Sequence, residues 1–289
     1  MKILPLIPLL AVPLLPWASP ARAGDTDGPD CARVLQDFGD APEGVPTYFG
    51  VIAHFPTLLA PGAPGTQESL CAPLGSAPGP TGFVRHLLDG TANYWLGCYT
   101  ANGQPSGIDG EPDGLAPDGD ETLFDGSDAG AQPEAVYALI CSSPNRVFFT
   151  TWNCGPERSA YLNVLVDLNH DGDWNDSVPC TDQAVCFLPC PEAQPCAFEW
   201  AVRNQLVTVR AGCDSHVSPN FFVGGLLGPT WMRVTVSDDP VGDDFPWAGS
   251  ANRPGGVLTG GETEDYLTFI DTGDPVLPST WGRLKVLYR

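Results

Sequence analysis

Basic residues are scarce in this chain. It contains 13 Lys and Arg against 35 Asp and Glu, so its formal net charge at pH 7 is −22. Such an excess of negative charge repels the phosphates of nucleic acids and of anionic lipids. We therefore expect no nucleic-acid partner. Charged residues make up only 17% of the chain, so the acidity comes from missing Lys and Arg rather than from dense charge.

Several other signals are also missing. No segment beyond the N-terminus is long and apolar enough to cross a bilayer, which predicts no membrane span. The motifs HExxH, GxSxG and GxxxxGK[ST] do not occur, and the 4 histidines are isolated in the sequence. These absences predict that the protein is not an enzyme.

Turn residues and apolar residues, by contrast, are abundant. The chain has 33 Gly and 31 Pro, is 43% hydrophobic, and shows no sustained helical periodicity. Short runs rich in Val, Leu, Phe, Tyr and Thr are bounded by Gly, Pro, Asn or Asp, as β-strands are. These runs cover residues 135–141, 146–152, 162–168, 206–211, 231–237 and 264–270. The run 231–237 alternates apolar and polar side chains, which predicts a half-buried antiparallel strand. The expected fold is an all-β antiparallel sandwich of jelly-roll or immunoglobulin-like type, with long acidic and disulfide-stapled loops.

The N-terminus has the pattern of a secretory signal. Lys2 precedes an apolar stretch over residues 3–17, and Ala21-Arg22-Ala23 is a small-x-small cleavage site. Prolines interrupt the apolar stretch, which is too short for a membrane anchor. We expect residues 1–23 to be a signal peptide and the protein to be secreted or placed on the cell surface.

Cysteine usage agrees with export. All ten cysteines follow residue 23, and an even number in an oxidising compartment predicts up to five disulfides. Four of them form a cluster at Cys180, Cys186, Cys190 and Cys196. A stapled loop is favoured there over a zinc site, because the spacing contains no CxxC pair.

The remaining organisation follows from composition. We expect an entry segment over residues 24–36, one β-sandwich domain over 37–271, and a linker with a short basic C-terminal tag over 272–289. That tag is either a sorting or docking signal or a last element packed on the domain. Residues 109–128 are rich in Asp and Glu without Lys or Arg, so this segment is solvated, disordered or ion-bound.

The segment 167–176 (DLNHDGDWND) has the ligand spacing of a calcium loop. Side chains with oxygen recur at positions 1, 3, 5, 7 and 9, and Gly172 occupies position 6, where a sharp turn is needed. Val178 stands at position 12, where a helix–loop–helix site has its bidentate Glu, so another acid must complete the shell. The alternative is a solvated Asx-rich turn. The candidate ligands in this segment are Asp167, Asn169, Asp171, Asp173, Asn175 and Asp176.

A second acidic segment, 260–266 (GGETEDY), offers remote ligands. Its three carboxylates at a strand start repel one another unless a cation or hydrogen-bond donors neutralise them. The alternative places Glu262 and Glu264 on a solvated strand face and Tyr266 in the core. We expect Ca²⁺ as cofactor, with Glu262, Glu264 and Asp265 as further candidate ligands.

Four motifs occur in a characteristic order: 37–42 (DFGDAP), 109–114 (DGEPDG), 166–174 (VDLNHDGDW) and 261–266 (GETEDY). Together they resemble the GEVED-domain family of secreted bacterial surface proteins, with Thr263 where the family name has Val. The resemblance implies a β-rich extracellular module, often attached to adhesion-like proteins, without established catalysis. Its partners would be a surface protein or a glycan.

A carbohydrate-active module is the alternative function. Paired carboxylates are abundant, and they are the groups that hydrolyse glycosidic bonds. Trp95, Trp152, Trp174 and Trp247 would stack on sugar rings if they were exposed, whereas core packing would bury them.

Overall fold

The computed structural model describes residues 36–37, 39, 41–57, 82–87, 94–98, 139–141, 143–179, 195–249 and 257–271. The expected signal peptide, the acidic segment 109–128, the side chains of the cysteine cluster and the C-terminal tag lie outside the described residues.

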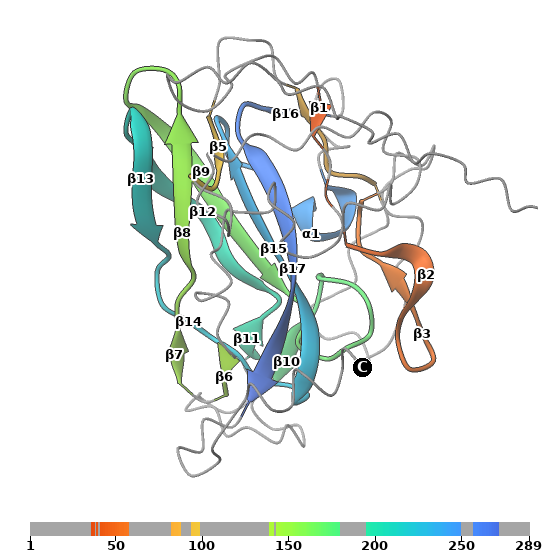
Figure 1. The fold of residues 1–289 in the computed structure, drawn as a ribbon. Coiled ribbons are helices and arrows are strands. Elements are labelled where there is room, and N and C mark those ends of the chain that lie inside the picture. The colour runs from red at the N-terminus through yellow and green to blue at the C-terminus, as the bar shows by residue number, and fades with distance from the viewer. Residues whose placement is uncertain are drawn as a thin grey trace, which may run out of the picture.

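The described chain is built almost entirely of β-strands, drawn as arrows in Figure 1. In chain order the elements are β1 (Gln36–Asp37), β2 (Glu43–Tyr48), β3 (Val51–His54), β4 (His86–Leu87), β5 (Tyr94–Leu96), β6 (Leu139–Ile140), β7 (Pro144–Asn145), β8 (Phe148–Asn153), β9 (Arg158–Val166), β10 (Ser177–Pro179), β11 (Pro195–Phe198), β12 (Trp200–Val209), β13 (Gly212–Val217), β14 (Phe221–Phe222), β15 (Gly228–Ser237), α1 (Phe245–Ala248), β16 (Leu258–Thr259) and β17 (Glu262–Asp271). Within the described residues no helix has the length and hydrophobicity needed to cross a bilayer.

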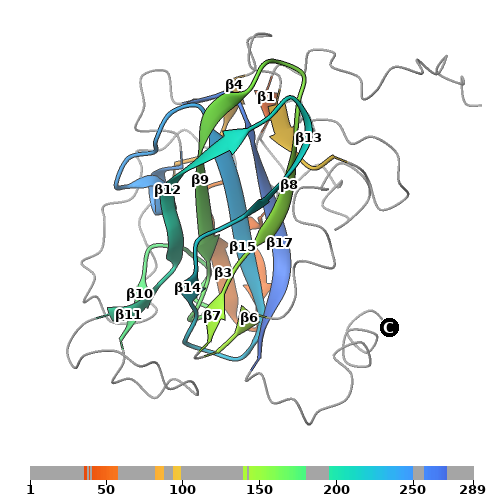
Figure 2. The same cartoon turned by 90° about the vertical axis from the view of Figure 1, so that its left-hand side faces the viewer.

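Two sheets pack face to face and form the sandwich. The larger sheet has the strand order β12-β9-β15-β17-β6, and the smaller one β13-β8-β5 (Figure 2). Tyr94 and Phe149 of the small sheet share one buried cluster with Val164, Val234 and Tyr266 of the large sheet. The predicted all-β sandwich is confirmed, and each of the six predicted strand runs overlaps a strand.

The other face of the large sheet is also covered. The hairpin β2–β3 and helix α1 lie on the side of this sheet away from β8 and β13 (Figure 1). Phe55, Trp174 and Phe245 pack there with Leu165 of β9 in a second buried cluster. The prediction that β15 is half-buried is therefore wrong, because a further layer covers its polar side as well.

A buried ion pair stands at the centre of that second layer. Arg233 of β15 donates to Asp265 of β17 from Nε at 2.7 Å and from Nη2 at 2.6 Å, and both side chains are almost fully buried. Asp265 also accepts the backbone N–H of Ala41 at 2.7 Å. A Cβ atom on Gly39 would lie 2.4 Å from Nη2 of Arg233, so only glycine fits beside the pair.

We expect Asp265→Asn to destabilise the protein by about 3–5 kcal/mol, because it leaves the Arg233 guanidinium buried without its counter-charge. Urea unfolding followed by tryptophan fluorescence measures the loss. Asp243→Asn is the matched control, since Asp243 is exposed and pairs with the exposed Arg203. Equal midpoints for the two variants would contradict the prediction.

A disulfide crosslinks the small sheet between the end of β5 and β13. Cys98, just after β5, bonds to Cys213 of β13, 115 residues further along the chain. This confirms one of the predicted disulfides. A crosslink that closes a loop of this length restricts the unfolded chain strongly.

The double variant Cys98→Ala/Cys213→Ala should lose about 2–5 kcal/mol of unfolding free energy, because the unfolded chain regains the freedom of that loop. Chemical denaturation under oxidising conditions measures the change while the other cysteines keep their state. A loss well under 1 kcal/mol would show that the bond adds little to stability.

Candidate metal centre

The loop after β9 folds around the carboxylate of Asp167. This side chain is fully buried and accepts the backbone N–H of His170 at 2.7 Å and that of Gly172 at 3.0 Å. Asn169 accepts the N–H of Asp171 at 3.0 Å, and Asp173 accepts the N–H of Asn175 at 3.0 Å. Alternate side chains thus turn inward and hold the loop's own backbone, as the sequence spacing predicts.

Gly172 makes the sharp turn possible. Its φ is +92°, a conformation that residues with a Cβ rarely adopt. A Cβ at this position would also lie 3.0 Å from the carbonyl oxygen of Ile52 in β3. Position 6 of the loop therefore needs glycine for its backbone angle and for its close approach to the hairpin.

Glu199, between β11 and β12, joins this loop from a distant part of the chain. It is fully buried, and its two carboxylate oxygens accept the N–H of Leu168 at 2.8 Å and the N–H of Asp176 at 3.0 Å. The sequence prediction missed this residue. The available signal was weak, because an acid within the apolar run 197–202 has no motif spacing to the loop.

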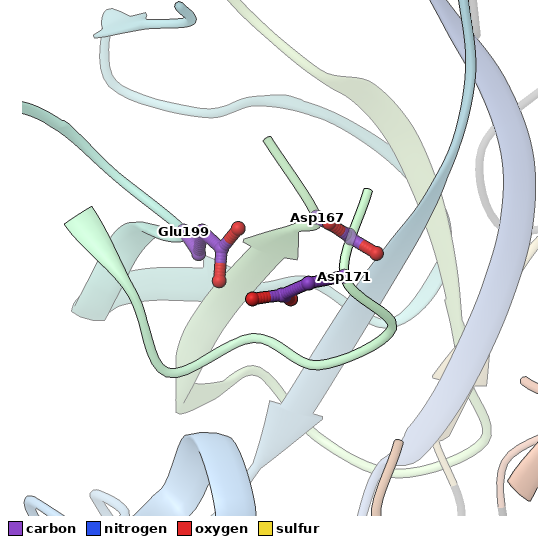
Figure 3. Close-up of side chains that lie close together, drawn as sticks. All are labelled: Asp167, Asp171 and Glu199. Atoms are coloured by element: carbon purple, nitrogen blue, oxygen red, sulfur yellow. The ribbon is translucent and has the colours of Figure 1, made fainter. Parts of the chain in front are cut away.

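Five carboxylates come together here. Oxygens of Asp167, Asp171 and Glu199 lie within 4.8 Å of one another, and so do oxygens of Asp171, Asp173 and Asp176. Figure 3 shows Asp167 and Asp171 on the loop and Glu199 reaching them from the neighbouring segment. Asp171 belongs to both groups, so the two groups form one continuous acidic cluster.

Burial and repulsion from neighbouring acids disfavour the ionised forms of Asp167, Asp173 and Glu199. Burial, followed by the charge of Asp171, raises the pKa of Asp167 to about 7 and that of Asp173 to about 8. Burial and then the charges of Asp167, Asp171, Asp173 and Asp176 raise the pKa of Glu199 well above its usual value. A divalent cation at this place would reverse the effect, because it stabilises the ionised carboxylates.

Two buried oxygen atoms in the loop are also suited to bind a cation. Oδ1 of Asp171 and Oδ1 of Asn175 have no hydrogen-bond partner among the described residues. A buried polar atom without a partner costs free energy, and a bound cation supplies one. The residues present therefore fit a cation that prefers oxygen ligands.

The second acidic segment faces other groups. Asp265 pairs with Arg233 as described above, and Glu262 accepts the N–H of Leu96 at 2.7 Å. Glu264 is buried in β17 between them. Neither of the two carboxylate groups at the loop contains these three acids, and the distant acid that joins the loop is Glu199. The alternative of a solvated face for Glu262 and Glu264 is wrong, whereas Tyr266 does enter the core.

Most of the tryptophans that were candidates for stacking on sugar rings are buried. Trp95, Trp174 and Trp247 are 4% exposed or less, so they cannot stack on a ligand from solvent. Trp152 is half-buried in β8. Core packing, the alternative reading for these residues, is confirmed for three of the four.

His86 has a structural role. Its Nδ1 donates to the carbonyl of Gly260 at 2.8 Å, so its Nε2 accepts from the hydroxyl of Thr263 at 2.9 Å. Thr235 then donates to Thr263 at 2.9 Å. Burial lowers the pKa of His86 to about 4, which keeps the ring neutral inside this chain of hydrogen bonds.

Comparison of the chain with known protein families, with curated proteins and with solved structures found no match in any of the three. The resemblance to the GEVED domain thus stays a prediction from the four sequence motifs.

In EDTA, stability should fall as the pH rises from about 7 to about 8.5. The raised pKa values of Asp167 and Asp173 mean that the folded state holds protons which the unfolded chain has already released, so deprotonation there favours unfolding. This window avoids His86, whose lowered pKa affects stability only at more acidic pH. Thermal unfolding midpoints at several pH values measure the slope.

Asp173→Asn is the control for this slope. The variant removes the group with the pKa of about 8, so its midpoint should depend less on pH than that of the wild type. An identical slope in both proteins would show that the cluster does not titrate in this range.

Proposed function

We propose that this protein is a non-catalytic extracellular or cell-surface module, of binding or structural role, that is stabilised by Ca²⁺. The observation that carries the proposal is the cluster of Asp167, Asp171, Asp173, Asp176 and Glu199, in which burial and neighbouring acids raise the pKa values of Asp167, Asp173 and Glu199. Bound calcium offsets this repulsion and orders the loop.

Calcium suits this cluster better than magnesium. Ca²⁺ accepts six to eight oxygen ligands in a flexible shell, whereas Mg²⁺ demands a small octahedron and gives up its waters reluctantly. Carboxylates and the amide side chains of Asn169 and Asn175 occur within one ten-residue loop. Glu199, between β11 and β12, supplies the acid that position 12 of the loop lacks.

The absence of catalysis is supported by burial. Asp167 and Glu199 have no exposed surface, which suits an internal cation better than a pair of catalytic carboxyls facing a substrate. The Cys98–Cys213 bond and the N-terminal leader pattern support an extracellular location. The order of GEVED-like motifs supports the same placement and favours a surface protein or a glycan as partner.

Calcium should raise the thermal midpoint of oxidised protein comprising residues 24–289, and magnesium at equal concentration should raise it less. Binding to the folded state alone adds about 2.7 kcal/mol at a hundredfold excess over Kd, and extracellular sites commonly have a Kd of about 10⁻⁴–10⁻³ M. Isothermal titration calorimetry gives the affinity directly. Asp171→Asn, which changes the acid shared by both groups, should abolish the shift.

Glu199→Gln and Asp243→Asn complete this experiment. The first should weaken calcium binding, because Glu199 closes the shell, and the second should leave it unchanged, because Asp243 is an exposed acid paired with Arg203. No calcium shift at millimolar concentration in the wild type would overturn the proposed function.

A further inference from the structure

The hairpin β2–β3 stands beside the acidic loop and pairs with no other strand of the described sheets. Residues 44–53 contain no charged side chain, although the whole chain has a net charge of −22. Phe49 at the tip is fully exposed, and Val45 and Ile52 are 43% and 46% exposed. Exposed apolar side chains on an acidic protein are suited to hydrophobic contacts. Where such contacts can form depends on the position of this hairpin.

The base of the hairpin is fixed by the buried ion pair. Nη1 of Arg233 donates to the carbonyl of Pro56 at 2.7 Å, and its Nη2 donates to the hydroxyl of Thr57 at 2.9 Å. The N–H of Thr57 in turn donates to Glu43 at 3.0 Å. These contacts do not involve the acidic loop, so they hold the base in place whether or not a cation is bound.

The body of the hairpin, by contrast, is held by the loop itself. His54 donates its backbone N–H to the carbonyl of Gly172 at 2.7 Å. The ring of Tyr48 stacks on His170 with centroids 5.0 Å apart. Its hydroxyl accepts the N–H of Trp231 at 3.1 Å and lies beside the carboxylate of Asp167, where it lowers the pKa of that acid.

Tyr48 is therefore placed as an outer partner of a cation ligand. A donor that bonds a ligating carboxylate fixes its orientation and raises its affinity for the ion. Tyr48 thus links the hairpin to the acidic loop through this hydroxyl and through the stack of its ring on His170. Since coupling between two equilibria is reciprocal, whatever fixes the loop also holds the hairpin, and whatever holds the hairpin favours the cation.

We propose that cation binding in the loop holds the hairpin β2–β3 against the sandwich, with Tyr48 as the positioning residue that connects Asp167 to the hairpin. With the cation bound, Phe49, Val45 and Ile52 are held in one position. Without it, the hairpin that carries them moves about its anchored base. This inference rests on the proposed calcium site and adds a regulated surface to it.

Hydrogen exchange followed by mass spectrometry tests the coupling, with CaCl₂ against EDTA as the probe. In the wild type, calcium should slow exchange over residues 43–54 by up to about a hundredfold at a hundredfold excess over Kd, because opening then requires release of the cation. Exchange in β13, which is far from the loop in the fold, is the internal reference and should not change.

Tyr48→Phe keeps the ring but removes the hydroxyl. It should reduce the calcium response of residues 43–54 by about tenfold or more while calorimetry still detects binding, weakened by about 10–100-fold. In EDTA the same variant should speed exchange at His170 and Gly172, whose N–H groups bond to Asp167. Tyr161→Phe in β9 is the matched control and should behave as the wild type.

The outcomes separate the two proposals. Calcium binding with an unchanged hairpin would overturn the coupling and leave the calcium site standing. A full hairpin response in Tyr48→Phe would overturn the role of Tyr48. Absence of calcium binding in the wild type would overturn both proposals together.

Discussion

The buried pair of Arg233 and Asp265 is the interaction on which the second layer of this fold depends. Every nitrogen of the guanidinium donates, to Asp265, to Pro56 and to Thr57, and its face lies 4.5 Å above the ring of Trp174. One charged side chain in the central sheet thus holds the N-terminal segment and a residue of the acidic loop. A buried pair is costly unless its hydrogen bonds are satisfied, and here they are.

Two groups of acidic side chains lie close together in this fold, and their negative charges are neutralised in different ways. Asp265 has a guanidinium at 2.6 Å. Asp167, Asp173 and Glu199 instead have other acids among the largest influences on their pKa values. The fold neutralises the first with its own cation, and the second is suited to a cation from solution. Trp174 and Gly172 connect the two regions, because the first contacts Arg233 and the second contacts the hairpin that Arg233 anchors.

The sequence pattern predicted the strands better than it predicted their surroundings. Apolar runs located β8, β9, β12, β15 and β17, because β-branched and aromatic residues bounded by turn residues report extended backbone. The alternation in β15 predicted one buried face and one solvated face. In the structure Arg233 and Thr235 are as buried as Val234. Alternation shows which face is polar, but it does not show whether another layer covers that face.

The sequence by itself determined the acidic loop. Its inward residues and the turn at Gly172 lie within ten consecutive residues, where spacing alone dictates which side chains point the same way. Only the tertiary structure decided which distant acid joins them. Glu199 reaches the loop across 23 residues from Asp176, while Asp265 bonds to Arg233 across 32. Strand pairing sets both choices, and pairing between distant segments depends on the packing of the whole sheet rather than on any local pattern.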